Sequence, residues 1–157
     1  MTQARRITAP LLTAALLLSS ASANAPYDGV VAVAVEELGY QESAHGETKY
    51  GEWAGDPTAQ WCTEFVSWCV NEADARQGTA MLGSIYPQSA SATGCKSWFV
   101  AQGRFVGDSG KCDGRKQWLS GASDYLSKDG YTPVAGDVMF LCLFSPEKGM
   151  DHAALVE

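Results

Sequence analysis

Residues 60–69 of the chain read QWCTEFVSWC, and the apolar residues of this stretch recur at helical spacing. The recurring positions are Trp61, Phe65, Trp68 and Cys69. This spacing predicts a helix from about Thr63 to Ala75. Cys62 follows a polar loop and opens the helix, where the unpaired N–H groups and the dipole favour a thiolate.

Two apolar runs further along the chain predict a β-hairpin. Residues 137–144 read DVMFLCLF, which is typical of a buried strand, and residues 152–156 read HAALV. Pro133 and Gly136 precede the first run as turn residues. The hairpin places His152 at its mouth. Because the predicted helices come first and the strands last, the sequence favours an α+β fold with an antiparallel sheet.

The segments around this helix and hairpin are less regular. A short apolar helix is predicted over Val30–Leu38, with Asp28 as its N-cap and Gly39 as its C-cap. A second short element contains Trp98 and Phe99. Two stretches rich in polar residues and glycine are typical of loops, residues 40–57 and 106–128.

The first residues have the pattern of a secretory signal peptide. Two arginines precede an apolar run from Ala9 to Leu18, and small residues lead to a cleavage point after Ala23, with cleavage after Ala25 as the alternative. A membrane anchor would need roughly 20 apolar residues, about twice the length of this run. We therefore expect a secreted protein with a signal peptide over residues 1–23, one domain over residues 24–157 and no integral membrane segment after cleavage.

The composition excludes several classes of partner. The 157 residues include 11 Lys and Arg against 18 Asp and Glu, a formal net charge of −7. Phosphate binding needs an excess of basic residues, so we expect neither a nucleic-acid partner nor a polybasic membrane anchor. Hydrophobic residues make up 46% of the chain, enough for a packed core and too many for a disordered chain.

The positions of the five cysteines limit which of them can form disulfides with one another. Cys62 and Cys69 are seven residues apart on one predicted helix, so about 10 Å separates their Cα atoms, whereas a disulfide needs roughly 4.4–6.8 Å. If Cys62 is free, Cys69, Cys95, Cys112 and Cys142 allow three full pairings, and a reduced, buried Cys69 or Cys142 is a further alternative. The sequence has no Cys-x-x-Cys pair, so we expect no metal site.

A cysteine at a helix start that faces a histidine on a sheet is the arrangement of a thiol nucleophile and its base. Cys62 and His152 are the candidates for these two roles. The alternatives are a half-cystine or buried small residue for Cys62 and a strand-edge imidazole for His152. His45 lies in the polar loop and is interpreted as an ordinary loop residue.

Four blocks in this order resemble the CHAP domains, the cysteine, histidine-dependent amidohydrolases/peptidases related to the NlpC/P60 group. The blocks are KYGEW (residues 49–53), QWCTEFVSWC (60–69), YTPVAGDVMF (131–140) and DHAALVE (151–157). Ile85–Phe105 also resembles the family's middle segment. The resemblance covers Val30–Glu157, with Val106–Lys128 as an insertion that is atypical of the family.

The resemblance implies a papain-like α+β fold, in which N-terminal helices pack on a small antiparallel sheet. It also implies a secreted enzyme that hydrolyses an amide or peptide bond in the stem peptide or cross-bridge of peptidoglycan, without metal or cofactor. Cys62 would be the nucleophile, His152 the general base and Gln60 a candidate oxyanion group, with an exposed loop glutamine as the alternative for Gln60. Asp137 is interpreted as a structural turn residue. Amidase and endopeptidase activities both remain open.

The sequence departs from the family pattern after the histidine. In the family a Glu, Asp or Asn on the following strand orients the histidine, but the sequence ends five residues after His152. Asp151 is a poor substitute because neighbours on a strand point to opposite faces. We therefore expect a fragment that lacks C-terminal strands, or a degenerate copy. The alternative functions are a non-catalytic wall-binding module and a disulfide-bonded structural domain in which Cys62 is paired.

Overall fold

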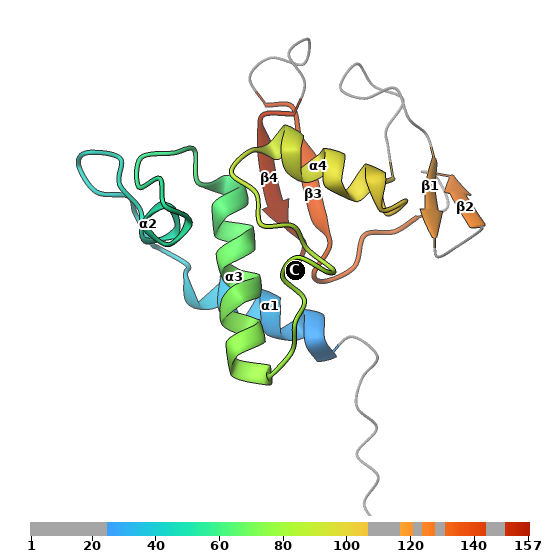
Figure 1. Ribbon diagram of the computed structural model, residues 1–157, viewed down its shortest axis with the longest axis horizontal. Helices are drawn as coiled ribbons and strands as arrows, with labels where there is room; N and C mark the ends of the chain where they lie inside the picture. Colours follow the sequence, from blue (N-terminus) through green and yellow to red (C-terminus); the bar gives the residue numbers. More distant parts are fainter. Residues whose placement is uncertain (1–24, 107–116, 121–123, 128–130, 144–149) are drawn as a thin grey trace, which may run out of the picture.

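A computed structural model describes residues 25–106, 117–120, 124–127, 131–143 and 150–157. These residues form helices and antiparallel strand pairs, so the fold is α+β, as the order of the elements predicts (Figure 1). The helices are α1 (Ala25–Glu36), α2 (Lys49–Ala54), α3 (Cys62–Gln77) and α4 (Ala92–Ala101). The strands are β1 (Gln117–Ser120), β2 (Asp124–Ser127), β3 (Val138–Leu141) and β4 (His152–Leu155). In this part of the chain, no helix combines the length and the apolar character that a membrane crossing needs.

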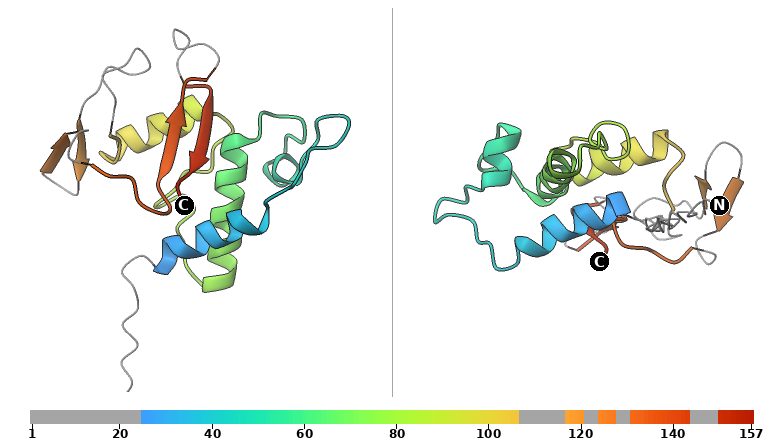
Figure 2. Two further views of the ribbon diagram at one scale, coloured as in Figure 1. Left: turned by 180° about the vertical axis from the view of Figure 1, so that it is seen from behind. Right: turned by 90° about the horizontal axis from the view of Figure 1, so that it is seen from below.

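Helix α3 lies at the centre of the fold. It contacts α1, α2, α4 and β4 (Figures 1 and 2). The buried core is formed by side chains of α1, α3, α4 and the segment between α3 and α4: Val30, Val33, Cys69, Val70, Ala73, Met81, Tyr86, Cys95 and Phe99. The predicted helix over Thr63–Ala75 is confirmed, and it extends by one residue at its start and by two at its end. The apolar period identified it because one side of α3 packs against this core.

The structure corrects the start of α1. The helix begins at Ala25, ahead of the valine run, and Asp28 lies in its first turn instead of at the N-cap. Pro26 fits there because a proline near the start of a helix lacks only an N–H that the helix leaves unpaired. Gly29 lies so close to α3 that a Cβ at this position would be 2.1 Å from Nε2 of Gln77. This nitrogen is the end of a flexible side chain that can move aside, so the close contact alone does not require glycine at this position.

The loop expected over residues 40–57 contains a helix, α2, which the sequence reasoning missed. The Thr48 hydroxyl caps this helix by accepting a hydrogen bond from the Gly51 N–H at 3.0 Å. Tyr50 is buried against aromatic rings of α3. Six residues are too few to show an apolar period or to form a stable helix alone. The packing of α2 on α3 therefore explains the helix, and it has no counterpart in the local sequence.

The predicted hairpin of residues 137–144 and 152–156 is confirmed by β3 and β4, but the expected burial of the first strand is wrong, since β3 is half-buried and its Met139 is exposed. The two strands are antiparallel, with Leu141 opposite His152 and Val138 opposite Leu155. Ala153 is 3% exposed, and Leu155 packs against the core. Because side chains alternate along a strand, His152 lies on the other face of the hairpin.

The prediction of a loop over residues 106–128 is wrong in part. Strands β1 and β2 pair antiparallel within it, with Gln117 opposite Ser127. Each strand contains one aromatic residue, Trp118 or Tyr125, a residue type that favours strands, among the polar residues and glycines on which the loop prediction depended. The rest of that stretch beyond Val106 and the predicted signal peptide over residues 1–23 lie outside the described residues.

Candidate functional site

The structure places Cys62 and His152 at the same end of two neighbouring elements. Cys62 is the first residue of α3, and His152 is the first residue of β4. Helix α3 packs against β4, and both elements run in the same direction, which Figure 1 and the left view of Figure 2 show from opposite sides. Both residues are half-buried. The fold thus brings together the two elements that carry the candidate nucleophile and base, while the His152 side chain lies on the face of β4 opposite Ala153 and Leu155, which pack toward the core.

The first turn of α3 has no side-chain cap. Trp61 occupies the N-cap position without accepting a hydrogen bond, whereas Thr48 and Ser91 cap α2 and α4 with their hydroxyl groups. The first N–H groups of an uncapped helix are left for another acceptor, and the helix dipole favours negative charge there. Backbone N–H groups in this position can stabilise an oxyanion next to the thiol of Cys62.

An aromatic cluster holds the segment that leads into Cys62. The ring of Trp61 lies 5.3 Å from that of Tyr50, and the ring of Phe65 lies 5.0 Å from the same tyrosine. The indole Nε1 of Trp61 also donates a hydrogen bond to the carboxylate of Glu42 at 3.1 Å. Aromatic pairs of this kind stabilise a fold by about 1 kcal/mol each beyond their buried area. The cluster therefore fixes the position of the residue just before Cys62.

The cysteines fall into an accessible and an inaccessible group. Cys62 is free and half-buried, whereas Cys69 and Cys95 are free and buried. Burial raises the pKa of the Cys69 and Cys95 thiols to about 12, and for Cys95 the neighbouring Cys62 adds to the effect. Cys142 is disulfide-bonded, and Cys112 lies outside the described residues.

These states correct the expected disulfides. A full pairing of the four other cysteines is wrong because Cys69 and Cys95 serve as small core residues in reduced form. The alternative of a reduced, buried Cys69 is confirmed, and the same alternative for Cys142 is wrong. The structural domain with a paired Cys62 does not fit the free thiol at this position.

The other polar residues named from the sequence are on turns and loops. Gln60 is exposed just before α3, and His45 is exposed in the loop before α2. Asp137 accepts a hydrogen bond from the Val134 N–H at 2.8 Å, which is the turn role expected for it. Asp151 accepts one from the Leu143 N–H at 2.8 Å, at the end of the β3–β4 hairpin where the connection between the strands begins.

Glu64 is a polar residue of α3 whose environment the sequence reasoning missed. Its side chain is 1% exposed, and neither carboxylate oxygen has a hydrogen-bond partner among the described residues. Burial, together with the negative charge of Asp56, raises the pKa of Glu64 above its ordinary value. The sequence holds one signal for it, since Glu64 is the one charged residue of the block QWCTEFVSWC, but only the packing shows that the side chain is enclosed.

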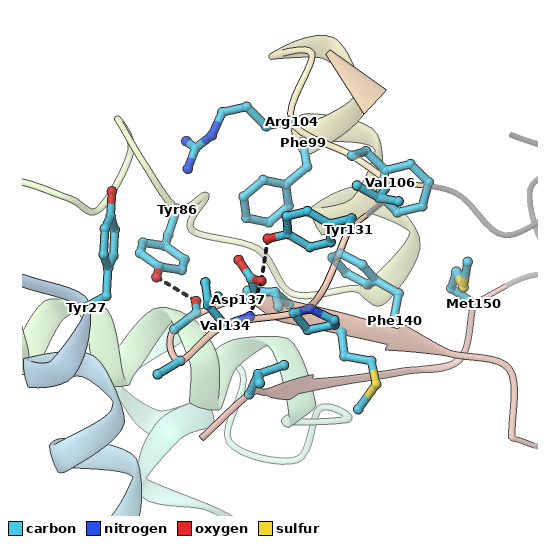
Figure 3. A pocket seen from close by; sticks show the side chains of 17 residues that line it. Tyr27, Tyr86, Phe99, Arg104, Val106, Tyr131, Val134, Asp137, Phe140 and Met150 are labelled. Atoms are coloured by element: carbon cyan, nitrogen blue, oxygen red, sulfur yellow. Dashed lines mark hydrogen bonds between the residues drawn. The ribbon is translucent and has the colours of Figure 1, made fainter. Parts of the chain in front are cut away.

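A cavity of about 550 Å³ lies elsewhere, between α4 and the loop that leads into β3 (Figure 3). Neither Cys62 nor His152 lines it. The Tyr86 hydroxyl donates to a backbone carbonyl of the turn before β3 at 2.6 Å, and the Tyr131 hydroxyl donates to Asp137 at 2.5 Å (dashed in Figure 3). Because these polar groups satisfy one another, we place the candidate site at the start of α3 and not in this cavity.

Neither a cluster of metal ligands among the described residues nor a known relative gives further information about the function of this site. The described residues contain no group of three or more His, Cys, Asp or Glu side chains that could hold a metal ion. Comparison of the chain with known proteins gave no match to a protein-family model, to a curated protein or to a solved structure.

Proposed function

We propose that the chain is a secreted cysteine-dependent hydrolase with a papain-like site, which cleaves an amide or peptide bond of peptidoglycan. The observation that supports this proposal most is the free, half-buried Cys62 at the start of α3, next to a strand that begins with His152. The resemblance of four sequence blocks to CHAP domains supplies the substrate class. The predicted signal peptide supplies the location outside the cell.

The reaction is acyl transfer through a thioester. His152 takes the proton of the Cys62 thiol, and the sulfur attacks the carbonyl carbon of the scissile amide. The uncapped N–H groups at the start of α3 stabilise the oxyanion, and the Gln60 side chain is a further candidate donor. His152 then protonates the leaving amine, and water hydrolyses the thioester to regenerate the thiol. Every group in this sequence of steps belongs to the chain or to water.

Digestion of purified peptidoglycan tests the proposal. The full chain, Cys62→Ala and His152→Ala are incubated with the wall material, and released fragments are identified by mass spectrometry. The unaltered chain is expected to release fragments, and neither variant is expected to release them. The control His45→Ala, at an exposed position, should keep full activity. The cut bond separates an amidase from an endopeptidase. Fragments from the Cys62→Ala protein would contradict the proposal, and binding to the wall without fragments would favour a non-catalytic wall-binding module.

A cross-linking experiment tests the pair itself, independently of substrate. The short reagent 1,3-dibromoacetone alkylates a thiol and then a second nucleophile within a three-carbon span. We expect one intramolecular link, between Cys62 and His152, in the peptide map. The His152→Ala variant should give only the singly alkylated cysteine. A link from Cys62 to another residue in place of His152 would exclude His152 as the base.

A further inference from the structure

The cavity of about 550 Å³ between α4 and the loop into β3 is the starting point for a second site. Its volume lies within the range of about 300–1,000 Å³ that is typical of small-molecule pockets. Neither Cys62 nor His152 lines it. A ligand in this cavity would therefore be bound apart from the candidate site at the start of α3.

Aromatic side chains form much of the wall of this cavity. The rings that line it are those of Tyr27, Tyr86, Phe99, Phe105, Tyr131 and Phe140. The ring of Phe99 meets the rings of Tyr86 and Phe140 edge to face, with centroids 6.4 Å and 6.1 Å apart. The edge of an aromatic ring carries positive partial charge and its face negative partial charge, so rings in different orientations offer favourable contacts to a further ring. The wall therefore favours a ligand with an aromatic group.

The wall is held in place by contacts within the protein. The Tyr86 hydroxyl donates to the Gly136 carbonyl oxygen at 2.6 Å, and the Tyr131 hydroxyl donates to Asp137 at 2.5 Å (Figure 3). Gly136 has a φ of 90°, and a Cβ at this position would be 2.8 Å from the Cβ of Tyr27. Glycine thus allows the loop before β3 to close one side of the cavity. A wall that is already ordered lowers the entropic cost of binding a ligand.

Arg104 supplies the positive charge of the lining. Its Nη1 donates to the Ile85 carbonyl oxygen at 2.9 Å, and its guanidinium carbon lies 5.8 Å from the centroid of the Phe99 ring. These two contacts hold the guanidinium beside the aromatic wall. A guanidinium has several N–H donors, and neither ion pair among the described residues involves Arg104. Its positive charge is therefore available to an anionic group of a ligand.

Asp137, the acidic residue of the lining, is already engaged. Its Oδ2 accepts a hydrogen bond from the Tyr131 hydroxyl and another from the Val134 N–H at 2.8 Å. Asp137 and Arg104 form no ion pair among the described residues, and Figure 3 shows the two side chains apart. The carboxylate thus serves the turn before β3, whereas the guanidinium has no anionic partner in the described part of the chain.

We propose that this cavity binds a small aromatic carboxylate, a ligand in which an aromatic ring and a carboxylate are joined by a short alkyl chain. The ring packs against Phe99, Tyr131 and Phe140. The carboxylate accepts charge-assisted hydrogen bonds from Arg104. This binding activity goes beyond the proposed hydrolase function and does not rest on it, because the cavity lies apart from Cys62 and His152.

Titration of the full chain with three small probes tests the proposal. 3-Phenylpropionate carries the ring and the charge, 3-phenylpropionamide has the same ring without the charge, and hexanoate has the charge without the ring. Binding at millimolar concentration is followed by NMR shifts of backbone amides. We expect saturable binding of 3-phenylpropionate, with the shifts at residues 103–106 and 133–140, which flank the cavity.

The two control probes should bind more weakly, each for its own reason. The amide should bind at least about tenfold more weakly, because it lacks the charged hydrogen bonds to Arg104. Hexanoate should bind about fivefold more weakly, because it lacks the ring contacts. No binding of 3-phenylpropionate, equal affinity for either control probe, or shifts confined to the start of α3 would overturn the proposal.

A fourth probe tests whether Asp137 is the charged anchor instead. 3-Phenylpropylamine has the same ring and carries a positive charge. We expect it to bind more weakly than 3-phenylpropionate, because Arg104 repels it and the Asp137 carboxylate is engaged in the turn. Tighter binding of the amine than of 3-phenylpropionate would overturn the proposal.

Two variants separate the cavity from the general charge of the chain. Arg104→Gln should weaken 3-phenylpropionate by at least about tenfold and leave the amide unchanged. The matched control Arg76→Gln removes the same charge from the last turn of α3, where Arg76 pairs with Glu36, and should leave both affinities unchanged. The circular dichroism spectrum checks that each variant is folded, and the comparison of probes on the unaltered chain depends on no variant. Equal weakening by the two variants would overturn the role of Arg104.

Discussion

The two ends of α3 differ in whether their polar groups have hydrogen-bond partners. At the first turn, Trp61 supplies no side-chain cap. The hydroxyl of Thr63 and both carboxylate oxygens of Glu64 are buried without hydrogen-bond partners among the described residues. At the last turn, the Asp74 carboxylate accepts three hydrogen bonds, and Gly78 ends the helix in the left-handed conformation with φ of 67°.

The difference separates a helix end whose polar groups stabilise the fold from one that buries polar groups without partners. Buried polar groups in native proteins are nearly always paired, so the unpaired ones in this turn lower the stability of the fold. That turn also carries the accessible thiol of Cys62. The Asp74 end, by contrast, ties α3 to the segment that follows it, from Thr79 to Leu82. Changes at the two ends should therefore have opposite effects on stability.

The largest expected effect is the difference in thiol reactivity along the helix. Iodoacetamide should alkylate Cys62 at least about a hundredfold faster than Cys69 or Cys95, because buried thiols react only when the structure opens. Burial also raises the pKa of those two thiols to about 12, so they are protonated at neutral pH. Peptide mapping over a time course measures the rates at each site. Comparable rates at Cys62 and Cys69 would show that the first turn is no more accessible than the core.

The next effect is a loss of stability at the Asp74 end. Asp74→Asn should lower the free energy of unfolding by about 2 kcal/mol, since charge-assisted hydrogen bonds to Thr79, Met81 and Leu82 are weakened or lost. Urea unfolding at pH 7 measures the change. Asp28→Asn, an exposed carboxylate in the first turn of α1, is the matched control and should cost less than about 1 kcal/mol. Equal losses for the two variants would contradict the role of Asp74.

The pH dependence of stability shows which charge state of Asp74 stabilises the fold. Burial opposes ionisation of Asp74, but the hydrogen bonds from the Thr79 hydroxyl and from the Leu82 and Met81 N–H groups outweigh it, so its pKa is lowered on folding. The stabilisation is therefore complete above the unfolded pKa of about 3.9 and is lost as the pH falls through the folded value. The difference between the chain and Asp74→Asn should be constant near neutral pH and shrink below about pH 4.

A smaller loss of stability is expected at the C-terminal end of α3. Gly78→Ala should destabilise the chain by about 1 kcal/mol, because alanine is strained at a φ of 67°. A Cβ at this position would meet nothing within 4 Å, so the cost is conformational and not steric. Thermal unfolding measures it, and Gly78→Asn should recover part of the loss because asparagine tolerates this conformation. An unchanged melting temperature for the alanine variant would show that the end of α3 is free to rearrange.

The smallest effect has the opposite sign and lies at the first turn. Glu64→Gln should raise the free energy of unfolding by up to about 1 kcal/mol at neutral pH, because glutamine avoids the cost of a buried, unpaired carboxyl. Burial raises the pKa of Glu64 on folding, so the chain loses stability as the pH rises from the unfolded pKa of about 4.3 through the folded value. Urea unfolding across this range should show the loss in the chain and not in the variant. A destabilised glutamine variant would mean that the ionised carboxylate has a partner.

Local patterns were sufficient for the longest elements. The spacing of Trp61, Phe65 and Trp68 predicted α3 because the helix presents one side to the core over its whole length. The apolar run before Phe144 and the run from His152 predicted β3 and β4, since a turn between two such runs brings them together as a hairpin. Short or interrupted elements were missed. The six-residue helix α2 and the start of α1 at Ala25 depend on contacts with α3, which no local period reports.

The sequence by itself determined which residues can do chemistry and on which elements they lie: a cysteine that opens a helix and a histidine that opens a strand. Only the tertiary structure decided that these two elements lie side by side in the same direction, because a helix and a strand so far apart in the sequence come together through packing and not through local preference. It also decided the state of Glu64, whose burial the sequence does not show. Burial removes its water and leaves its charge unpaired, and that enclosure comes from the chain folded around it.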